Sequence, residues 1–365
     1  MNDDKLKNLK DLVQKRKLDS LLISNFYSIY YFTGFKGAVP EDRESYLIFD
    51  GEKLNLFAPR LYQNEALALR SAHIDITIVP ERNEFMSLIL GFLNKNKGKR
   101  IGFESEDLKY SEFVELSTAL TKGKSLVATT SLVGALREIK VEEEIKLMQK
   151  AQEITYTGFA AILPVIKTGI TEAEIAEKLK KAMIGLGAQG ESFTSIVATN
   201  ANAALPHYQT STNKLKKGDL ILIDWGALYK GYCGDSTRVL TLGGASERVK
   251  KTHRLVVKAH DEGIKAVKSG VPANSVFNAA NEVFVKEGLE DKFIHGLGHG
   301  IGMAIHEAPS IRRTNSDRLK EGQVFSIEPG LYFKEWGGVR IEDLVVCRKD
   351  KAEVLGKFST DLIEL

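Results

Sequence analysis

Four acidic residues lie in or next to strongly apolar runs in the second half of the chain, and this placement limits the possible folds more than any other feature. These residues and runs are Asp224 in LILID (220–224), Asp235 before STRVLTLG (236–243), Glu328 in VFSIE (324–328) and Glu342 in VRIEDLVVC (339–347). Each run has the length and composition of a buried β-strand. Charged side chains are rarely buried unless they are paired or bind metal. The pattern therefore predicts strands that gather carboxylates around cations.

The first two runs are separated by a short segment that predicts a β-hairpin. If the strands pair about Tyr229-Lys230, with Gly231 in a left-handed bulge position, Asp224 lies directly opposite Asp235. Opposed residues in an antiparallel pair have Cβ atoms about 4.5–5.5 Å apart. Carboxylates that close repel each other unless one is protonated or a cation lies between them. The two aspartates alone could also flank an ordinary turn, but the two glutamates in apolar strands favour a metal site.

The segment HGLGHGIGMAIHE (295–307) alternates glycine with larger residues over its first half. So many glycines disfavour a helix and suit an extended chain that another backbone or a ligand approaches closely. A phosphate-binding loop is a weaker interpretation, because no P-loop lysine follows and the dinucleotide spacing is missing. In an extended chain His295 and His299 lie about 13 Å apart, so one is predicted to bind metal and the other to contact substrate.

His306 and His207 add two imidazoles near these motifs, although each alone could be an ordinary structural histidine. His253 and His260 lie on a predicted helix and are interpreted as structural. Ligands rich in oxygen, with one nitrogen and no sulfur, favour Mn²⁺, Mg²⁺, Co²⁺ or Zn²⁺. Two such ions sharing carboxylates would lie about 3.5–4 Å apart and bridge a hydroxide, as in two-metal hydrolases. The residues thus predict metal-assisted hydrolysis and leave open which bond is cleaved.

The first half of the chain has a different pattern, in which short apolar runs alternate with helical segments. The predicted strands are 18–24, 45–50, 54–59, 74–80, 100–104 and 125–130, and the predicted helices are 81–96 and 110–121. This is the pattern of an α/β domain. It has one histidine, His73, and no cluster of residues that indicates chemistry. A scaffold or an oligomerisation domain is the favoured interpretation.

The second half is predicted to be α+β, with hairpins between long helices. Helices are predicted over 141–164, from the capping box Thr171-x-x-Glu174 to Leu186, and over 246–268. We place the domains at 1–132 and 133–365. The chain is 365 residues long, which suits two domains better than one hydrophobic core.

Composition excludes several classes of protein. Lys and Arg total 51 against 48 Asp and Glu, for a net charge of +3, so nucleic acid is not an expected partner. Two cysteines exclude a disulfide framework. No apolar run approaches the roughly 18 residues that span a bilayer, and the charged start lacks the apolar stretch of a secretory signal. We expect a cytoplasmic protein that does not bind membranes.

The metal-site residues and their surroundings, HGxGHGxG, IEPG and RIED, resemble the pita-bread metallopeptidases, which include methionine aminopeptidase, aminopeptidase P and prolidase. The first half, with YYFTGF (30–35), APRLY (58–62) and IGFE (101–104), is similar to the creatinase-like N-terminal domain of aminopeptidase P and prolidase. The resemblance implies a metal set of Asp224, Asp235, His299, Glu328 and Glu342. It also implies a role for each member.

Asp224 would chelate one metal, Asp235 and Glu342 would bridge, and His299 and Glu328 would complete the second. Glu328 would also accept the proton of the bridging water. The remaining implied residues are His207 and His306 at the scissile bond, His295 in the specificity pocket, and Tyr332 and Arg340 as supports of the substrate and metal site.

The resemblance favours cleavage of the bond before proline, by a Xaa-Pro aminopeptidase or a Xaa-Pro dipeptidase. Trp225 and Tyr208 are candidates for the wall of the proline pocket, and Arg312 and Arg313 for a cap on a free carboxylate. The alternatives are a methionine-type aminopeptidase and a metal-free creatinase-like or binding protein. We expect Mn²⁺, with Co²⁺ or Zn²⁺ as alternatives that the ligand set permits, and the resemblance further implies a homodimer.

Overall fold

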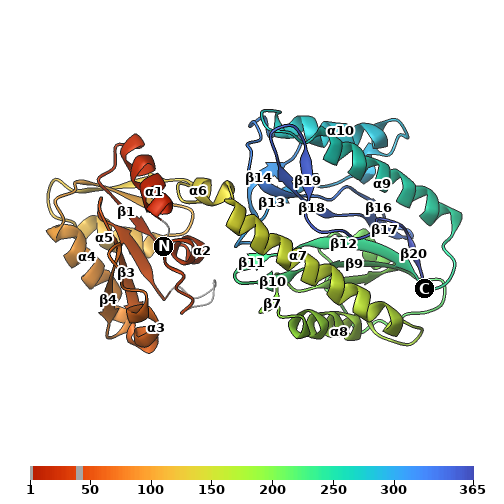
Figure 1. The fold of residues 1–365 in the computed structure, drawn as a ribbon, viewed down its shortest axis with the longest axis horizontal. Helices are drawn as coiled ribbons and strands as arrows, with labels where there is room; N and C mark the ends of the chain where they lie inside the picture. Colours follow the sequence, from red (N-terminus) through yellow and green to blue (C-terminus); the bar gives the residue numbers. More distant parts are fainter. Residues whose placement is uncertain (1–2, 38–43) are drawn as a thin grey trace. The chain divides into compact units, whose positions relative to one another are not determined.

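The computed structural model describes residues 3–37 and 44–365. The chain forms two compact units, residues 1–137 and 138–365 (Figure 1). Among the described residues, none of the helices combines the length and the apolar composition that crossing a membrane requires.

A six-stranded mixed sheet forms the centre of the first unit, in the order β4-β3-β2-β1-β5-β6. Its strands are β1 (Ser20–Ile23), β2 (Tyr46–Phe49), β3 (Leu54–Pro59), β4 (Ile74–Val79), β5 (Arg100–Glu104) and β6 (Ser125–Thr129). The helices are α1 (Asp3–Lys15), α2 (Phe26–Thr33), α3 (Gln63–Ala68), α4 (Phe85–Lys95), α5 (Tyr110–Ala119) and α6 (Gly134–Glu138), with the short 3₁₀ helices η1 (Arg60–Tyr62) and η2 (Arg82–Glu84). All six strands predicted for this half are present.

Both faces of this sheet are buried, which explains why its strands are apolar without alternation. Leu21 and Ile23 of β1 pack in the same cluster as Leu9 of α1 and Phe32 of α2. Leu22 points to the other face and packs in a cluster with residues of α4 and α5. The predicted α/β layout of the first half is confirmed.

The second unit is built from four sheets, which are ordered β20-β12-β9-β8, β14-β13-β15-β18-β19, β11-β10-β7 and β16-β17. Its strands are β7 (Gly190–Glu191), β8 (Ile196–Thr199), β9 (Leu220–Trp225), β10 (Ala227–Tyr229), β11 (Tyr232–Cys233), β12 (Ser236–Thr241), β13 (Gly298–Gly300), β14 (Glu307–Ile311), β15 (Val324–Ile327), β16 (Gly330–Phe333), β17 (Gly337–Arg340), β18 (Asp343–Cys347), β19 (Ala352–Val354) and β20 (Ile363–Glu364).

Two pairs of helices enclose these strands (Figure 1). The helices are α7 (Glu142–Ile162), α8 (Glu172–Gly185), α9 (Glu247–Ala266) and α10 (Ala273–Val285), with η3 (Leu163–Val165), η4 (Asn200–Ala204) and η5 (Glu290–Lys292). Phe159 of α7 and Leu179 of α8 share a core with Ile223. Val256 of α9 and Phe284 of α10 share another core with strands of both larger sheets. The predicted α+β architecture is confirmed, and α10 is a helix that the sequence pattern did not predict.

The predicted register of the Asp224 hairpin is wrong. Tyr229 pairs with Tyr232, so the two turn residues are Lys230 and Gly231, with φ of 47° and 81°. Positive φ at both positions defines the tight turn that suits the twist of a hairpin. The pairing shifts accordingly, and Asp224 lies opposite Thr237 rather than Asp235.

The prediction of a single strand over 339–347 is also wrong. β17 ends at Arg340 and pairs with β16, whereas β18 begins at Asp343 and pairs with β15. Glu342 lies in the break and forms an isolated bridge with Thr237 of β12. The break therefore places Glu342 where the two larger sheets meet.

Candidate metal centre

The strands bring together the five residues predicted to bind metal, from five places in the chain. Asp224 comes from β9, Asp235 from the segment before β12, His299 from β13, Glu328 from the end of β15 and Glu342 from the break before β18. One ligand atom from each of Asp235, His299 and Glu342 lies within 4.8 Å of the other two. These three form the tightest part of the group.

His299 presents one ring nitrogen to the carboxylates. Its Nδ1 lies 3.1 Å from the carbonyl oxygen of Gly300, which can only accept a hydrogen bond, so Nδ1 carries the proton. Its Nε2 lies 3.6 Å from Asp235 Oδ2 and 3.6 Å from Glu328 Oε1. Burial lowers the pKa of His299, which favours the neutral ring. A lone pair thus faces two carboxylates, as a metal ligand does.

The carboxylates are held close together in a buried environment. Asp235 is 3% exposed and Glu342 is 2% exposed. Burial raises the pKa of Asp235, and the nearby charges of Glu342, Asp224 and Glu328 raise it further. Burial and the charges of Glu328 and Asp224 likewise raise the pKa of Glu342. Without a cation, these groups are therefore hard to ionise together.

Two further side chains organise the carboxylates. Arg340 donates from Nη2 to Asp224 Oδ2 at 2.6 Å and from Nε to the hydroxyl of Thr237 at 2.9 Å. Thr237 donates its hydroxyl proton to Glu342 Oε2 at 2.6 Å. The hydroxyl of Ser326 donates to Glu328 Oε1 at 3.1 Å and accepts from the amide of His299 at 3.0 Å.

The donor set fits divalent cations. Asp224 Oδ1 and Asp235 Oδ1 are buried and have no hydrogen-bond partner among the described residues. Arg340 is the guanidinium that lines the site, and one positive charge cannot balance four carboxylates. Oxygen donors with one imidazole suit Mn²⁺, Co²⁺ or Zn²⁺. Cations would therefore satisfy both the unpaired oxygens and the excess negative charge.

The centre opens onto a cavity of about 380 Å³. His207, His295 and His306 line it together with the metal-site residues, and Phe193, Ile196, Pro206 and Ile305 supply an apolar wall. The rings of His299 and His306 pack edge to face, with centroids 4.4 Å apart. All four histidines predicted for the site thus face one space that a peptide could enter.

Tyr332 contacts the cavity residues rather than lining the cavity itself, within the part of the chain that the structure describes. Its hydroxyl lies 2.8 Å from His295 Nε2 and accepts from Arg340 Nη1 at 3.0 Å. The Nδ1 of His295 lies 2.7 Å from the carbonyl oxygen of Gly296. Burial lowers the pKa of His295. Tyr332 therefore links the orientation of His295 to that of Arg340.

Trp225 does not form a wall of the cavity, which corrects the prediction. Its side chain is fully buried, stacks on Phe159 with centroids 4.2 Å apart and donates from Nε1 to the carbonyl of Thr155 at 2.8 Å. Successive strand residues point to opposite faces, so Trp225 points away from its neighbour Asp224. Arg312 and Arg313 are not among the cavity-lining residues that the structure describes, and Arg313 lies over the ring of Phe277.

Thr237 and Ser326 belong to the site and were missed in the sequence. A usable signal was present, because side chains two residues apart in a strand share a face. Ser326 precedes Glu328 by two residues, and Thr237 follows Asp235 by two. Ser326 at that spacing donates to Glu328 itself, whereas Thr237 shares the site of Asp235 but donates to Glu342.

A buried carboxylate and histidine cluster that opens onto a cavity is the arrangement of a metal-dependent hydrolase. Comparisons with known proteins agree. Residues 146–349 match the model of metallopeptidase family M24, and residues 5–139 match the creatinase/prolidase N-terminal domain. A Xaa-Pro dipeptidase of Pyrococcus horikoshii is 31% identical over 361 residues, covering 99% of each chain.

Solved structures show the same similarity. A Xaa-Pro dipeptidase from Bacillus anthracis superposes with a TM-score of 0.93 at 29% identity, over 99% of each chain. An X-Pro aminopeptidase from Thermotoga maritima gives a TM-score of 0.90 at 32% identity, over 98% of this chain and 99% of the other. The chain belongs to metallopeptidase family M24. It is a metallopeptidase with a creatinase-like N-terminal domain followed by a pita-bread domain.

Proposed function

We propose that this metallopeptidase uses two divalent cations to hydrolyse the peptide bond that precedes proline. The observation that carries the proposal is the group of Asp235, His299 and Glu342, whose two carboxylates are buried, flanked by Asp224 and Glu328. The relatives named as Xaa-Pro dipeptidases and an X-Pro aminopeptidase support the choice of substrate.

The positions of the ligands suggest how they divide between two cations. Asp224 lies beside Arg340, and Glu328 lies beside His299, so these groups would hold different cations. Asp235 and Glu342 would contact both, as the sequence resemblance implies, and their ligand atoms lie within 4.8 Å of each other and of His299. Mn²⁺ is the cation that we propose, with Co²⁺ or Zn²⁺ as alternatives that the same donors accept.

The cations would polarise the scissile carbonyl and supply a water of lowered pKa. Glu328 would accept a proton from that water, because it lies beside His299 and lines the cavity. His207 and His306 lie on the cavity wall, where they can donate to the substrate carbonyl. His295, held by Tyr332, would bound the specificity pocket.

Whether the substrate is a dipeptide or a longer peptide depends on whether the site binds a free carboxylate directly after proline. The relatives named as dipeptidases favour a Xaa-Pro dipeptide. Arg340 is the guanidinium among the cavity-lining residues and is already bound to Asp224, which favours a longer peptide without a carboxylate after proline. Both substrates are therefore tested side by side.

The experiment measures proline release from a Xaa-Pro dipeptide and release of the first residue from a Xaa-Pro-Yaa tripeptide, with Mn²⁺-loaded protein. Cleavage of the dipeptide alone defines a dipeptidase, and cleavage of the tripeptide defines an aminopeptidase. A Xaa-Ala dipeptide and an N-terminal methionine peptide are the controls for proline specificity. Protein that binds Mn²⁺ yet cleaves neither proline substrate contradicts the proposal.

We further propose a homodimer, as the sequence resemblance implies, and a cytoplasmic location, as expected from the composition. Sedimentation velocity at several protein concentrations tests the first. Fractionation of the source cells tests the second.

A further inference from the structure

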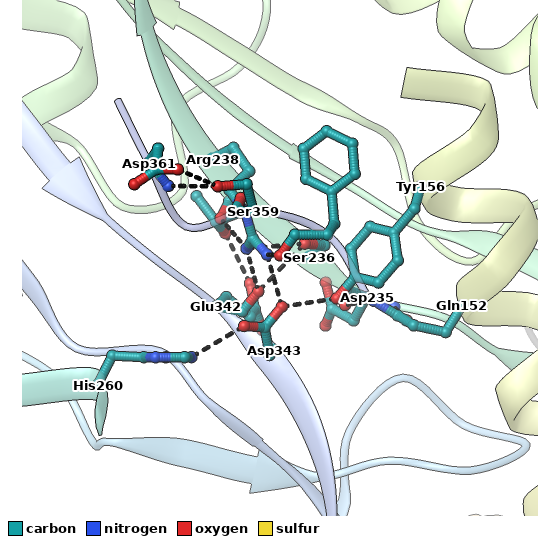
Figure 2. Close-up of polar contacts among 12 residues, drawn as sticks. Gln152, Tyr156, Asp235, Ser236, Arg238, His260, Glu342, Asp343, Ser359 and Asp361 are labelled. Carbon is teal, nitrogen blue, oxygen red and sulfur yellow. Dashed lines mark hydrogen bonds and ion pairs between the residues drawn. The ribbon is translucent and has the colours of Figure 1, made fainter. Parts of the chain in front are cut away.

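Behind the metal centre, a second group of buried polar side chains surrounds Asp343, which follows Glu342 in the sequence (Figure 2). Adjacent residues of an extended chain point to opposite faces. Glu342 and Thr237 contact each other on the metal side. Their neighbours Asp343 and Arg238 contact each other on the other side, with Arg238 Nη2 and Asp343 Oδ1 2.7 Å apart.

Arg238 reaches the main chain of Glu342. Its side chain is fully buried, and its Nη1 donates to the carbonyl of Glu342 at 2.7 Å and to the carbonyl of Thr237 at 3.0 Å. The hydroxyl of Ser236 donates to the same Glu342 carbonyl at 3.1 Å. Because Glu342 lies in a break between two strands, these contacts replace the regular ladder that would otherwise fix its backbone.

Asp343 in turn is fixed from two helices. Tyr156 of α7 donates its hydroxyl to Asp343 Oδ1 at 2.6 Å. His260 of α9 places Nε2 3.1 Å from Asp343 Oδ2. The carboxylate that orients Arg238 is thus tied to helices that lie on opposite sides of the strands (Figures 1 and 2).

Asp235, the other carboxylate residue of the tight group, has its main chain held by a side chain of α7. Gln152 is fully buried, donates from Nε2 to the carbonyl of Asp235 at 2.8 Å and accepts from the amide of Asp235 at 3.0 Å. Gln152 and Tyr156 are one helical turn apart and therefore share a face of α7. That face contacts the main chain of Asp235 and the side chain of Asp343, the residue after Glu342.

We propose that Arg238 and Gln152 are positioning residues that set the affinity of the metal centre by fixing the main chain of Glu342 and Asp235, respectively. The inference rests on the metal site of the proposed function and adds the residues behind it. Buried partners that orient ligands change metal affinity or activity by about 10- to 100-fold when they are removed. Neither residue is among the cavity-lining residues that the structure describes, so their effect would pass through the backbone.

Three variants test this role. Arg238→Lys keeps a positive charge near Asp343 but cannot make the forked contacts to the main chain. Gln152→Met keeps the side-chain length and removes both hydrogen bonds to Asp235. Tyr156→Phe removes one hydroxyl that orients Asp343 and leaves the ring in place. The matched control is Tyr232→Phe, because Tyr232 is equally buried and donates its hydroxyl to Glu144 at 2.8 Å, away from Asp343.

The experiment measures Mn²⁺ binding to chelator-stripped protein by isothermal titration calorimetry, and the visible absorption spectrum of the Co²⁺-loaded protein. Arg238→Lys and Gln152→Met should weaken Mn²⁺ binding about 10-fold or more and shift the Co²⁺ bands. Tyr156→Phe should weaken binding by a smaller factor, of about 3. Tyr232→Phe should bind as the wild type does, even if its melting temperature falls.

Wild-type affinity and spectrum in folded Arg238→Lys, Gln152→Met and Tyr156→Phe would overturn the inference. If Arg238→Lys and Gln152→Met fail to fold, the inference is tested by comparing the Mn²⁺ affinity of Tyr156→Phe with that of the control Tyr232→Phe. Wild-type protein that binds no Mn²⁺ would overturn the metal site itself. Variants with weakened Mn²⁺ binding support the inference whether or not the wild type cleaves Xaa-Pro peptides, so the two proposals are tested separately.

Discussion

Thr237 and Glu342 are joined twice across the meeting point of two sheets. The hydroxyl of Thr237 donates to Glu342 Oε2 at 2.6 Å, and the carbonyl of Thr237 accepts from the amide of Glu342 at 3.2 Å. Arg340 donates to the same hydroxyl at 2.9 Å. Because that oxygen accepts from Arg340, its proton is directed at Glu342. One threonine therefore fixes both the backbone and the carboxylate of a metal-site residue.

Thr237→Val should lower the activity of the Mn²⁺-loaded enzyme about 10- to 100-fold, because valine keeps the shape and removes the hydrogen bond. Initial rates on the cleaved Xaa-Pro peptide measure the loss. The control is Thr241→Val on the same strand, where the buried hydroxyl donates to the carbonyl of Gly243. Equal losses of activity in both variants would show that any threonine-to-valine change in β12 lowers activity, and would contradict a specific role for the hydrogen bond between Thr237 and Glu342.

Asp235→Asn should have opposite effects on stability with and without metal. In chelated protein the substitution removes one of several crowded carboxylates, so the melting temperature should rise by about 2 °C or more. Addition of Mn²⁺ should raise the melting temperature of the variant much less than that of the wild type. Turnover of the variant should fall at least about 100-fold. Thermal melts with EDTA and with Mn²⁺ check this. A melting temperature of Asp235→Asn below that of the wild type in EDTA would contradict repulsion among the carboxylates.

Gly298→Ala should destabilise the second unit by on the order of 3 kcal/mol or more, because a Cβ at this position would lie 1.8 Å from the carbonyl oxygen of Ser326. The strand that carries His299 depends on that close approach, as the glycine alternation predicted. Urea unfolding measures the change. Gly190→Ala is the control, since no atom lies within 4 Å of its Cβ, and its effect should stay within about 0.5 kcal/mol.

His260 and His253 lie on the same helix. Replacing each by glutamine should change the free energy of unfolding with pH in opposite directions. Burial lowers the pKa of His260, but the nearby carboxylates of Asp261 and Asp343 outweigh burial and raise it above 6.5. A raised pKa means that the folded state binds the proton more tightly, so the contribution to stability is complete below pH 6.5 and is lost as pH rises through the folded pKa. His260→Gln should therefore cost more free energy of unfolding at pH 5.5 than at pH 9.

Burial lowers the pKa of His253 below 6.5, so the sign reverses. Its folded form resists protonation, and the wild type loses stability as pH falls through 6.5. His253→Gln should therefore cost less at pH 5.5 than at pH 9. Urea unfolding of the chelated proteins at both pH values measures the two differences. If the loss of unfolding free energy changed with pH in the same direction in both variants, the opposite pKa shifts of His260 and His253 would be contradicted.

Much of the site could be predicted from the sequence because charge in an apolar strand is rare. That rule marks Asp224, Asp235, Glu328 and Glu342, and it also marks Asp343. Applied to basic residues, the same rule also marks Arg238, which is surrounded by the apolar strand STRVLTLG. Arg238 was missed because the rule was applied to acidic residues alone, and Asp343 was passed over although it is acidic and lies in the same apolar run as Glu342.

The remaining errors came from features that depend on backbone conformation and tertiary pairing. The hairpin register depended on Lys230 adopting a positive φ, which a lysine seldom does. The break at Glu342 was hidden because the apolar pattern continues through it. It exists because β17 and β18 pair with different strands, and periodicity within one segment does not reveal its partners. Trp225 was misplaced for a related reason, since a strand residue next to a site residue points away from the site.

The contact between Thr237 and Glu342 joins residues that are 105 positions apart in the sequence. A ribosome therefore makes Asp224 and Asp235 long before it makes Glu328 and Glu342. The nascent chain cannot enclose a cation until these last strands have emerged and paired. With the proposed function, metal loading would be tied to the end of synthesis, and a truncated chain that ends before Glu342 would carry Asp224 and Asp235 without the other residues of the site.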